Sequence, residues 1–84
     1  MSLNDELWSW LGREAEGDFT ADLSLCFKWL IPKLWVCEMV MHEGIFFAWR
    51  VGAPNYGEPI NGGAFETPAL ALCKAISELI DGEK

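Results

Sequence analysis

The chain has 84 residues, and its six basic and 13 acidic side chains give a formal net charge of −7 at pH 7. A chain of this length forms one domain, and so acidic a surface opposes direct binding to nucleic-acid phosphates or anionic lipid. Hydrophobic residues make up 51% of the sequence and include five Trp and five Phe, more bulky apolar surface than a small domain readily buries. We therefore expect one domain over residues 1–84, with the surplus aromatic surface either half-buried or in contact with a partner protein or a second copy.

The cysteines and the N-terminal residues predict a compartment. Cys26, Cys37 and Cys73 are odd in number, far apart and set among apolar residues, which favours buried free thiols over disulfides. Residues 4–6 are polar or acidic where a signal peptide carries basic residues, and no uncharged run reaches the length of about 18 residues that a membrane helix needs. We expect a cytoplasmic protein with no membrane span.

The first predicted helix covers residues 4–15. Asn4 or Asp5 can cap its free amide groups, and Gly17 marks the break that follows. Its apolar arc consists of Leu7, Trp8, Trp10, Leu11 and Ala15.

The second predicted helix covers residues 20–31, with Asp22 in its first turn and Pro32 directly after its end. Leu25 and Trp29 lie four residues apart and form a secondary apolar strip, which meets either the first helix or another subunit. The main buried face is expected to consist of Leu23, Cys26, Phe27 and Leu30.

A β-hairpin is predicted from two runs of aromatic and aliphatic residues, 35–42 and 45–51, separated by Glu43-Gly44. Glu-Gly is a weaker turn signal than Asn-Gly, so the register can shift to that of a longer loop. Both faces of this hairpin are largely apolar, and we expect amphipathic helices to cover both of them.

With a two-residue loop, Val40 would face Phe47, and Glu38 would face Trp49. After the hairpin, residues 52–63 are dense in Gly, Pro and Asn, which predicts a long surface loop. A short third strand is expected at residues 64–66.

The clearest element is a helix over residues 67–81. Thr67 can cap it, Pro68 suits its first position, and Gly82 can end it in a left-handed conformation. One side of the helix is apolar and consists of Ala69, Leu72, Cys73, Ile76, Leu79 and Ile80. The expected fold is therefore α+β, a small antiparallel sheet packed among three helices.

Two helix openings carry a family resemblance. Residues 19–23 read Phe-Thr-Ala-Asp-Leu, and residues 66–75 read Glu-Thr-Pro-Ala-Leu-Ala-Leu-Cys-Lys-Ala. Together with the order of elements, they resemble the phage ABA sandwich domain family over most of the chain. The resemblance implies a hairpin-containing sheet among helices and a phage or prophage origin, and it brings no activity or catalytic residue.

The sequence lacks a motif for chemistry. His42 is the single histidine, and the three cysteines show no Cys-x-x-Cys spacing, so neither a zinc site nor a Cys-His nucleophile is predicted. We predict no catalytic residue, no cofactor and no metal. The weaker alternative is an enzyme that uses Glu38 or Cys37 in a cleft. Burial beside Trp49 would raise the pKa of the Glu38 carboxyl and suit it to act as an acid or base.

The leading hypothesis is a noncatalytic accessory protein of phage or prophage type that contacts another protein in the host cytoplasm. Its expected contact residues are Trp8, Trp29 and Tyr56. The alternative is an acidic decoy that inhibits a nucleic-acid-binding protein, which requires carboxylates in rows like those of DNA phosphates.

Overall fold

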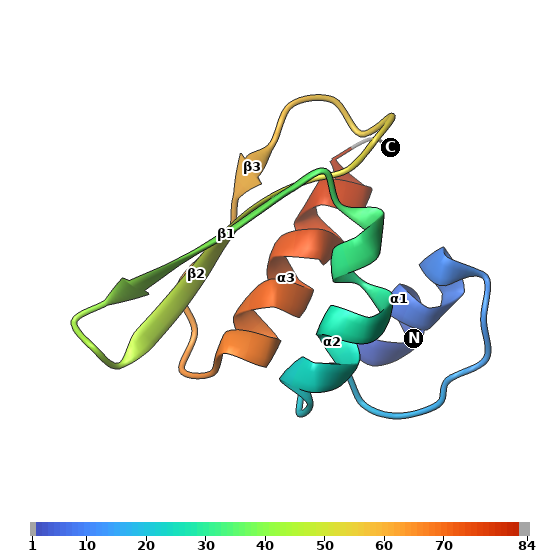
Figure 1. Cartoon of the computed structure of the whole chain (residues 1–84), viewed down its shortest axis with the longest axis horizontal. Helices are drawn as coiled ribbons and strands as arrows, with labels where there is room; N and C mark the ends of the chain where they lie inside the picture. Colours follow the sequence, from blue (N-terminus) through green and yellow to red (C-terminus); the bar gives the residue numbers. More distant parts are fainter. Residues whose placement is uncertain (1, 83–84) are drawn as a thin grey trace.

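The computed structural model describes residues 2–82, so the predicted domain range of 1–84 extends beyond them at both ends. It has the α+β arrangement that the sequence predicts (Figure 1). The elements are α1 (Leu3–Leu11), α2 (Leu23–Trp29), the short 3-10 helix η1 (Ile31–Lys33), β1 (Val36–His42), β2 (Phe46–Gly52), β3 (Ile60–Asn61) and α3 (Pro68–Asp81). None of the helices within residues 2–82 combines the length and the apolar character needed to cross a membrane.

Helix α1 is shorter than predicted and has a different cap. The Ser2 side chain accepts a hydrogen bond from the Asp5 amide at 3.1 Å, so neither Asn4 nor Asp5 is the cap. Asn4 instead holds the following loop, because it donates to the Gly17 carbonyl and accepts from the Phe19 amide, both at 2.9 Å. The helix ends at Gly12, whose φ of 72° is left-handed.

Helix α2 begins later than residue 20 because Asp18 and Asp22 each fix a turn. Asp18 accepts hydrogen bonds from the amide and hydroxyl of Thr20, and Asp22 caps the helix by accepting from the Leu25 amide at 3.1 Å. Of the predicted buried face, Cys26 and Leu30 are buried and Leu23 is half-buried. Phe27 is 53% exposed, so its predicted burial is wrong.

Helix α3 begins as the sequence predicts. Thr67 accepts a hydrogen bond from the Leu70 amide at 3.2 Å, and Pro68 occupies the first turn. The left-handed stop is wrong, because Gly82 has φ −65° and bonds back to the Glu78 carbonyl in a helical conformation.

The strands pair in the order β1-β2-β3, with a register one residue away from the predicted one. Met39 pairs with Trp49, and Val40 pairs with Ala48. The pairing starts at His42 and Phe46, so the connection has three residues, 43–45. Glu43 and Gly44 both have positive φ, and the extra residue Ile45 donates to the His42 carbonyl at 3.2 Å.

The third strand lies earlier than predicted. β3 pairs with β2 through Ile60 and Asn61, whereas in the predicted strand at 64–66 only Phe65 pairs, through two backbone hydrogen bonds with Phe47. Between them, Gly62 passes so close to α3 that an added Cβ would lie 2.6 Å from the Cβ of Ala75. The pairing with β2 shifts by one residue between the Arg50-Asn61 and Phe47-Phe65 pairs, so residues 60–65 do not form one regular strand.

The helices cover one face of the sheet. α3 packs against β2, and α1 and α2 pack against α3, which gives the layers sheet, α3 and α1 with α2 (Figure 1). Trp49 and Val51 point into this core, whereas Val40 and Arg50 lie on the opposite face, which no helix within residues 2–82 covers. The prediction that helices shield both faces is therefore wrong. The largest fully buried side chains are Trp8, Phe19, Leu7, Leu30, Leu72, Ile76, Val51, Cys26 and Cys73.

Candidate functional site

Trp8, one of three predicted contact residues, belongs to the core. Its side chain is 1% exposed and stacks on Phe19 with the ring centroids 4.3 Å apart, while its indole N–H donates to the Gly17 carbonyl at 3.0 Å. The prediction that Trp8 contacts a partner is wrong, because this side chain already has both apolar and polar partners within the chain.

Trp29 lies half-buried at the junction of α1 and α2. Its ring meets Trp8 edge-on at 6.2 Å, and the Arg13 guanidinium lies over it, 4.0 Å from the ring centroid. Leu25 packs on the loop at Gly17, where an added Cβ would come within 2.8 Å of it. Of the two alternatives for the Leu25-Trp29 strip, the structure thus shows contact with the first helix and its loop.

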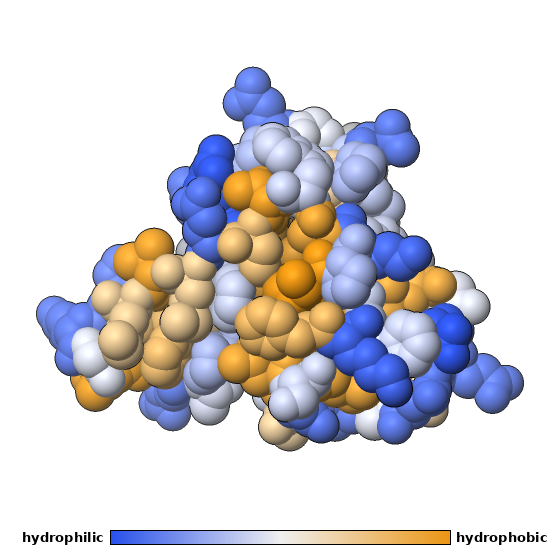
Figure 2. Space-filling model, in the orientation of Figure 1, coloured by the Kyte–Doolittle hydropathy of each residue, from blue (hydrophilic) through white to orange (hydrophobic). Residues whose placement is uncertain are grey.

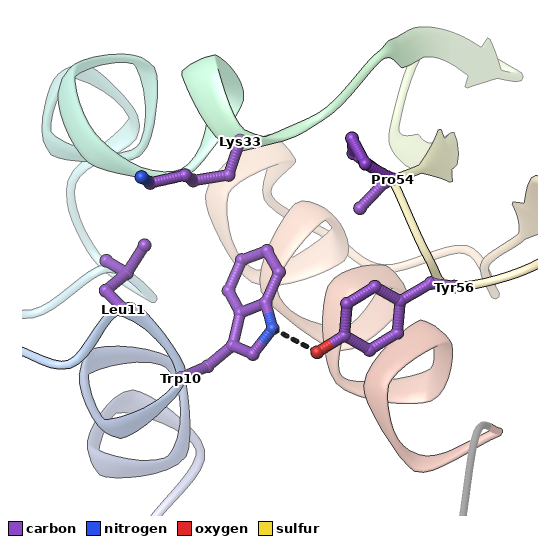
Figure 3. Close-up of a pocket in the computed structure, with 6 residues that line it drawn as sticks. Trp10, Leu11, Lys33, Pro54 and Tyr56 are labelled. Carbon is purple, nitrogen blue, oxygen red and sulfur yellow. Dashed lines mark hydrogen bonds between the residues drawn. The ribbon is translucent and has the colours of Figure 1, made fainter.

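Tyr56 is fixed rather than loose in the long loop. Its hydroxyl accepts a hydrogen bond from the Trp10 indole N–H at 2.8 Å, and the two rings meet edge-on at 6.0 Å. Figure 3 shows this pair at the wall of a pocket between α1, η1 and the loop. The pocket has a volume of about 290 Å³ and is lined by Trp10, Leu11, Lys33, Ala53, Pro54 and Tyr56.

This pocket suits an apolar group beside a polar rim. Its walls are mainly apolar, Lys33 supplies a cation, and none of the described lining residues is acidic although the chain carries 13 acids. An aromatic or aliphatic side chain of a partner protein would fit such a lining. Of the predicted contact residues, Tyr56 therefore lies where an apolar group can reach it.

Exposed apolar side chains also lie along the hairpin. Five of the six exposed large hydrophobic residues in the described chain lie on it or beside it, each between 46% and 60% exposed. We call these five the hairpin surface: Trp35, Met39, Val40, Met41 and Ile45. Figure 1 shows the hairpin projecting away from the helices, and Figure 2 shows the apolar colouring of this arm.

Strand β1 is also an edge strand. β2 lies on one side of it, and no strand within residues 2–82 lies on the other. The exposed edge of a sheet presents unpaired N–H and C=O groups that can pair with another chain. Natural edge strands often carry lysine or proline against such pairing, and Val36–His42 contains neither.

The groups considered for catalysis do not converge. Glu38 is exposed and lies 3.8 Å from Arg50 on the open face of the sheet, and the predicted partner Trp49 is on the opposite face. Burial raises the pKa of the Cys37 thiol to about 11, so the thiol is protonated and weakly nucleophilic at neutral pH. Residues 2–82 contain no group of three His, Cys, Asp or Glu side chains that could hold a metal ion.

The other two cysteines form a buried pair. The Cys26 thiol donates to the Phe19 carbonyl at 3.2 Å, and its sulfur is hydrogen-bonded to Cys73. The hydrogen bond with Cys26 and burial both raise the pKa of Cys73, so this thiol stays neutral. The predicted free thiols at Cys26 and Cys73 are confirmed as buried parts of the core, whereas Cys37 is half-buried.

The acidic side chains are distributed over the whole chain. The densest group lies at residues 14–22, but most of its members have local roles: Glu16 pairs with Arg13 at 2.9 Å, and Asp18 and Asp22 fix turns. This use within the chain gives the decoy hypothesis no support.

Comparisons with protein-family models, with curated proteins and with solved structures found no match to this chain.

Proposed function

We propose that the chain is a noncatalytic protein-interaction module that binds another protein through the hairpin surface. The observation that carries this proposal is that five large apolar side chains gather on one projecting hairpin. Several exposed large apolar side chains on one element are typical of an interaction site in a small domain. Methionine and tryptophan, both present in the hairpin surface, are enriched at protein interfaces.

The energetics favour a partner that covers these side chains. Apolar surface removed from water stabilises a complex by roughly 25 cal/mol per Å², before the costs of association are subtracted. Trp35 directly precedes β1, Ile45 directly precedes β2, and they are the most exposed of the five, at 60% and 59%. They are therefore the contacts that a foreign protein would bury most.

Trp29 and Tyr56 remain proposed contacts of lower weight. Both are half-buried, and their rings already pack on Arg13 and Trp10, respectively. The Tyr56 pocket offers a second place for an apolar side chain of the same partner. A phage or prophage accessory role in the host cytoplasm is part of the proposal, and it rests on the sequence resemblance.

A comparison of two substitutions tests the proposal. The bait is the purified protein, and the lysate comes from cells of the organism that encodes it, grown with and without induction of phage genes. We expect the native bait to retain a protein from the lysate. When that protein is purified and titrated, it should bind the bait that carries Trp35→Ser and Ile45→Ser at least about tenfold more weakly than the native bait. The loss follows from removing two exposed apolar side chains without changing the net charge.

The matched control is Phe27→Ser. Phe27 is 53% exposed, which is close to the exposure of Trp35 and Ile45, but it lies on α2 away from the hairpin. The Phe27→Ser bait should bind as the native bait does. Equal binding by the native, control and doubly substituted proteins would contradict the hairpin surface as the contact.

A further inference from the structure

The hydrogen bonds that β2 makes on the side away from β1 determine which way the backbone groups of β1 point. Phe47 exchanges both backbone hydrogen bonds with Phe65, and the Trp49 carbonyl accepts from the Gly62 amide. The N–H and C=O groups of Phe47 and Trp49 therefore point away from β1. Because these directions alternate along a strand, those of Ala48 between them point toward β1.

The register then fixes which groups of β1 face outward. Val40 lies opposite Ala48, so its backbone groups point inward to β2. By alternation, the N–H and C=O groups of Cys37, Met39 and Met41 point to the open side, where no strand within residues 2–82 meets them. The side chains of these three residues lie on the same face of the sheet as Trp49 and Val51, which is the face that α3 covers.

We infer that β1 pairs with β1 of a second copy, antiparallel and centred on Met39. In this register Met39 lies opposite Met39 of the second copy, and Cys37 lies opposite Met41. All the outward N–H and C=O groups of the three residues then find partners, whereas a shift by two residues in either direction leaves some of them unpaired. The inference rests on the proposed function, because both treat the hairpin as an interaction surface. It adds that a second copy occupies the open edge of β1.

The bodies of the two copies fit in this arrangement. Three strand spacings of about 4.8 Å place the two β2 strands about 14 Å apart, and each carries its own α3 on the same face of the joined sheet. Packed helices need about 8–10 Å between their axes, so the two α3 helices do not collide. Met39 and Met41 of both copies lie over the strands between them, and flexible methionine side chains can fill this space.

Charge opposes pairing only weakly at this edge. Residues 35–52 hold two acidic and one basic side chain, a net charge of −1 out of the −7 of the chain. In the centred register Glu38 lies opposite Val40 of the second copy, so no two carboxylates face each other directly. Glu38 also has Arg50 within 3.8 Å in its own chain. The edge is therefore a part of this acidic molecule that a second copy can approach with little repulsion.

A charge exchange at the centre of the pairing tests the inference. The native protein should have the mass of a dimer by light scattering. Met39→Lys and Met39→Glu each place like charges opposite one another across the two-fold axis, so each variant alone should self-associate at least about tenfold more weakly. A one-to-one mixture of the two variants should regain the dimer, because the charges then attract.

Cross-linking tests the register. Met41→Cys places a thiol opposite Cys37 of the second copy at a Cα separation of about 5.5 Å, which a disulfide can span. After oxidation with diamide, which takes up the two hydrogens of the thiols, the variant should run as a linked dimer containing a Cys37-to-position-41 peptide. Val40→Cys, whose side chain lies on the other face, should not link to Cys37, and the native protein gives the background.

Several results would overturn the self-pairing: a native monomer at about millimolar concentration, a dimer that Met39→Lys leaves intact, a variant mixture that stays monomeric, or equal linking by Val40→Cys and Met41→Cys. The proposed function is decided separately. A native monomer whose capture of a foreign protein depends on Trp35 and Ile45 would overturn the dimer alone. A dimer that passes both tests but retains no foreign protein through those residues would overturn the proposed function alone.

Discussion

At the scale of single residues, Gly62 has a role that its place in a glycine pair does not reveal. Gly62 lies in the predicted surface loop, but an added Cβ there would lie 2.6 Å from the Cβ of Ala75 and 3.1 Å from its Cα. Gly62→Ala should therefore lower the free energy of unfolding by about 1–3 kcal/mol through overpacking, measured by urea denaturation. Gly63→Ala is the control, because its Cβ would meet Phe65 at 3.5 Å, an ordinary contact. Equal effects of the two substitutions would contradict this close packing.

Cys37 provides a pH-dependent measurement at the same scale. Burial raises the pKa of its thiol to about 11, so the rate of alkylation by iodoacetamide should keep rising up to about pH 11. A thiol whose pKa is higher in the folded chain stabilises the fold fully below its ordinary pKa of 9.0, and this contribution is lost as the pH rises from there toward about 11. Peptide mass spectrometry gives the rate at Cys37. A plateau near pH 9 would show that the thiol is not desolvated.

At the scale of elements, sequence reasoning succeeds where several local signals agree. The cap, the first-turn proline and the apolar side of α3 all indicate the same helix, and its predicted start at Thr67 is confirmed. Ser2, Asn4 and Asp5 can each cap a helix, so the start of α1 could not be chosen from residue type alone. Likewise, an apolar strand has the same pattern whether a helix or a partner covers it, so the exposure of the hairpin surface could not be read from the sequence.

The error in register comes from the hairpin turn, which has three residues, 43–45, in place of the predicted two. Glu43 has a φ of 57°, a conformation in which asparagine is tolerated better than glutamate. Glu43→Asn should raise the free energy of unfolding by up to about 1 kcal/mol, whereas Glu43→Val should lower it because a β-branched residue is strained there. Thermal unfolding followed by circular dichroism measures both. If the asparagine variant were the less stable of the two, the left-handed turn would be contradicted.

At the scale of the whole molecule, charge opposes association and salt relieves it. Two copies each carry a net charge of −7, of which the hairpin contributes little. Raising the ionic strength from about 0.01 M to about 0.15 M shortens the Debye length from roughly 30 Å to roughly 8 Å. The dissociation constant of the proposed dimer should therefore fall with added salt, as measured by analytical ultracentrifugation. A dissociation constant that rises with salt would indicate ion pairs in place of the apolar edge.

The sandwiching of α3 between the sheet and the two other helices affects how the chain acquires its structure during translation. The sheet and the N-terminal helices contact α3 much more than they contact each other. Residues 68–81 are synthesised after all the elements that pack on them. The earlier helices and the hairpin thus leave the ribosome before the helix on which they pack, and we expect their packed arrangement to form only after α3 emerges.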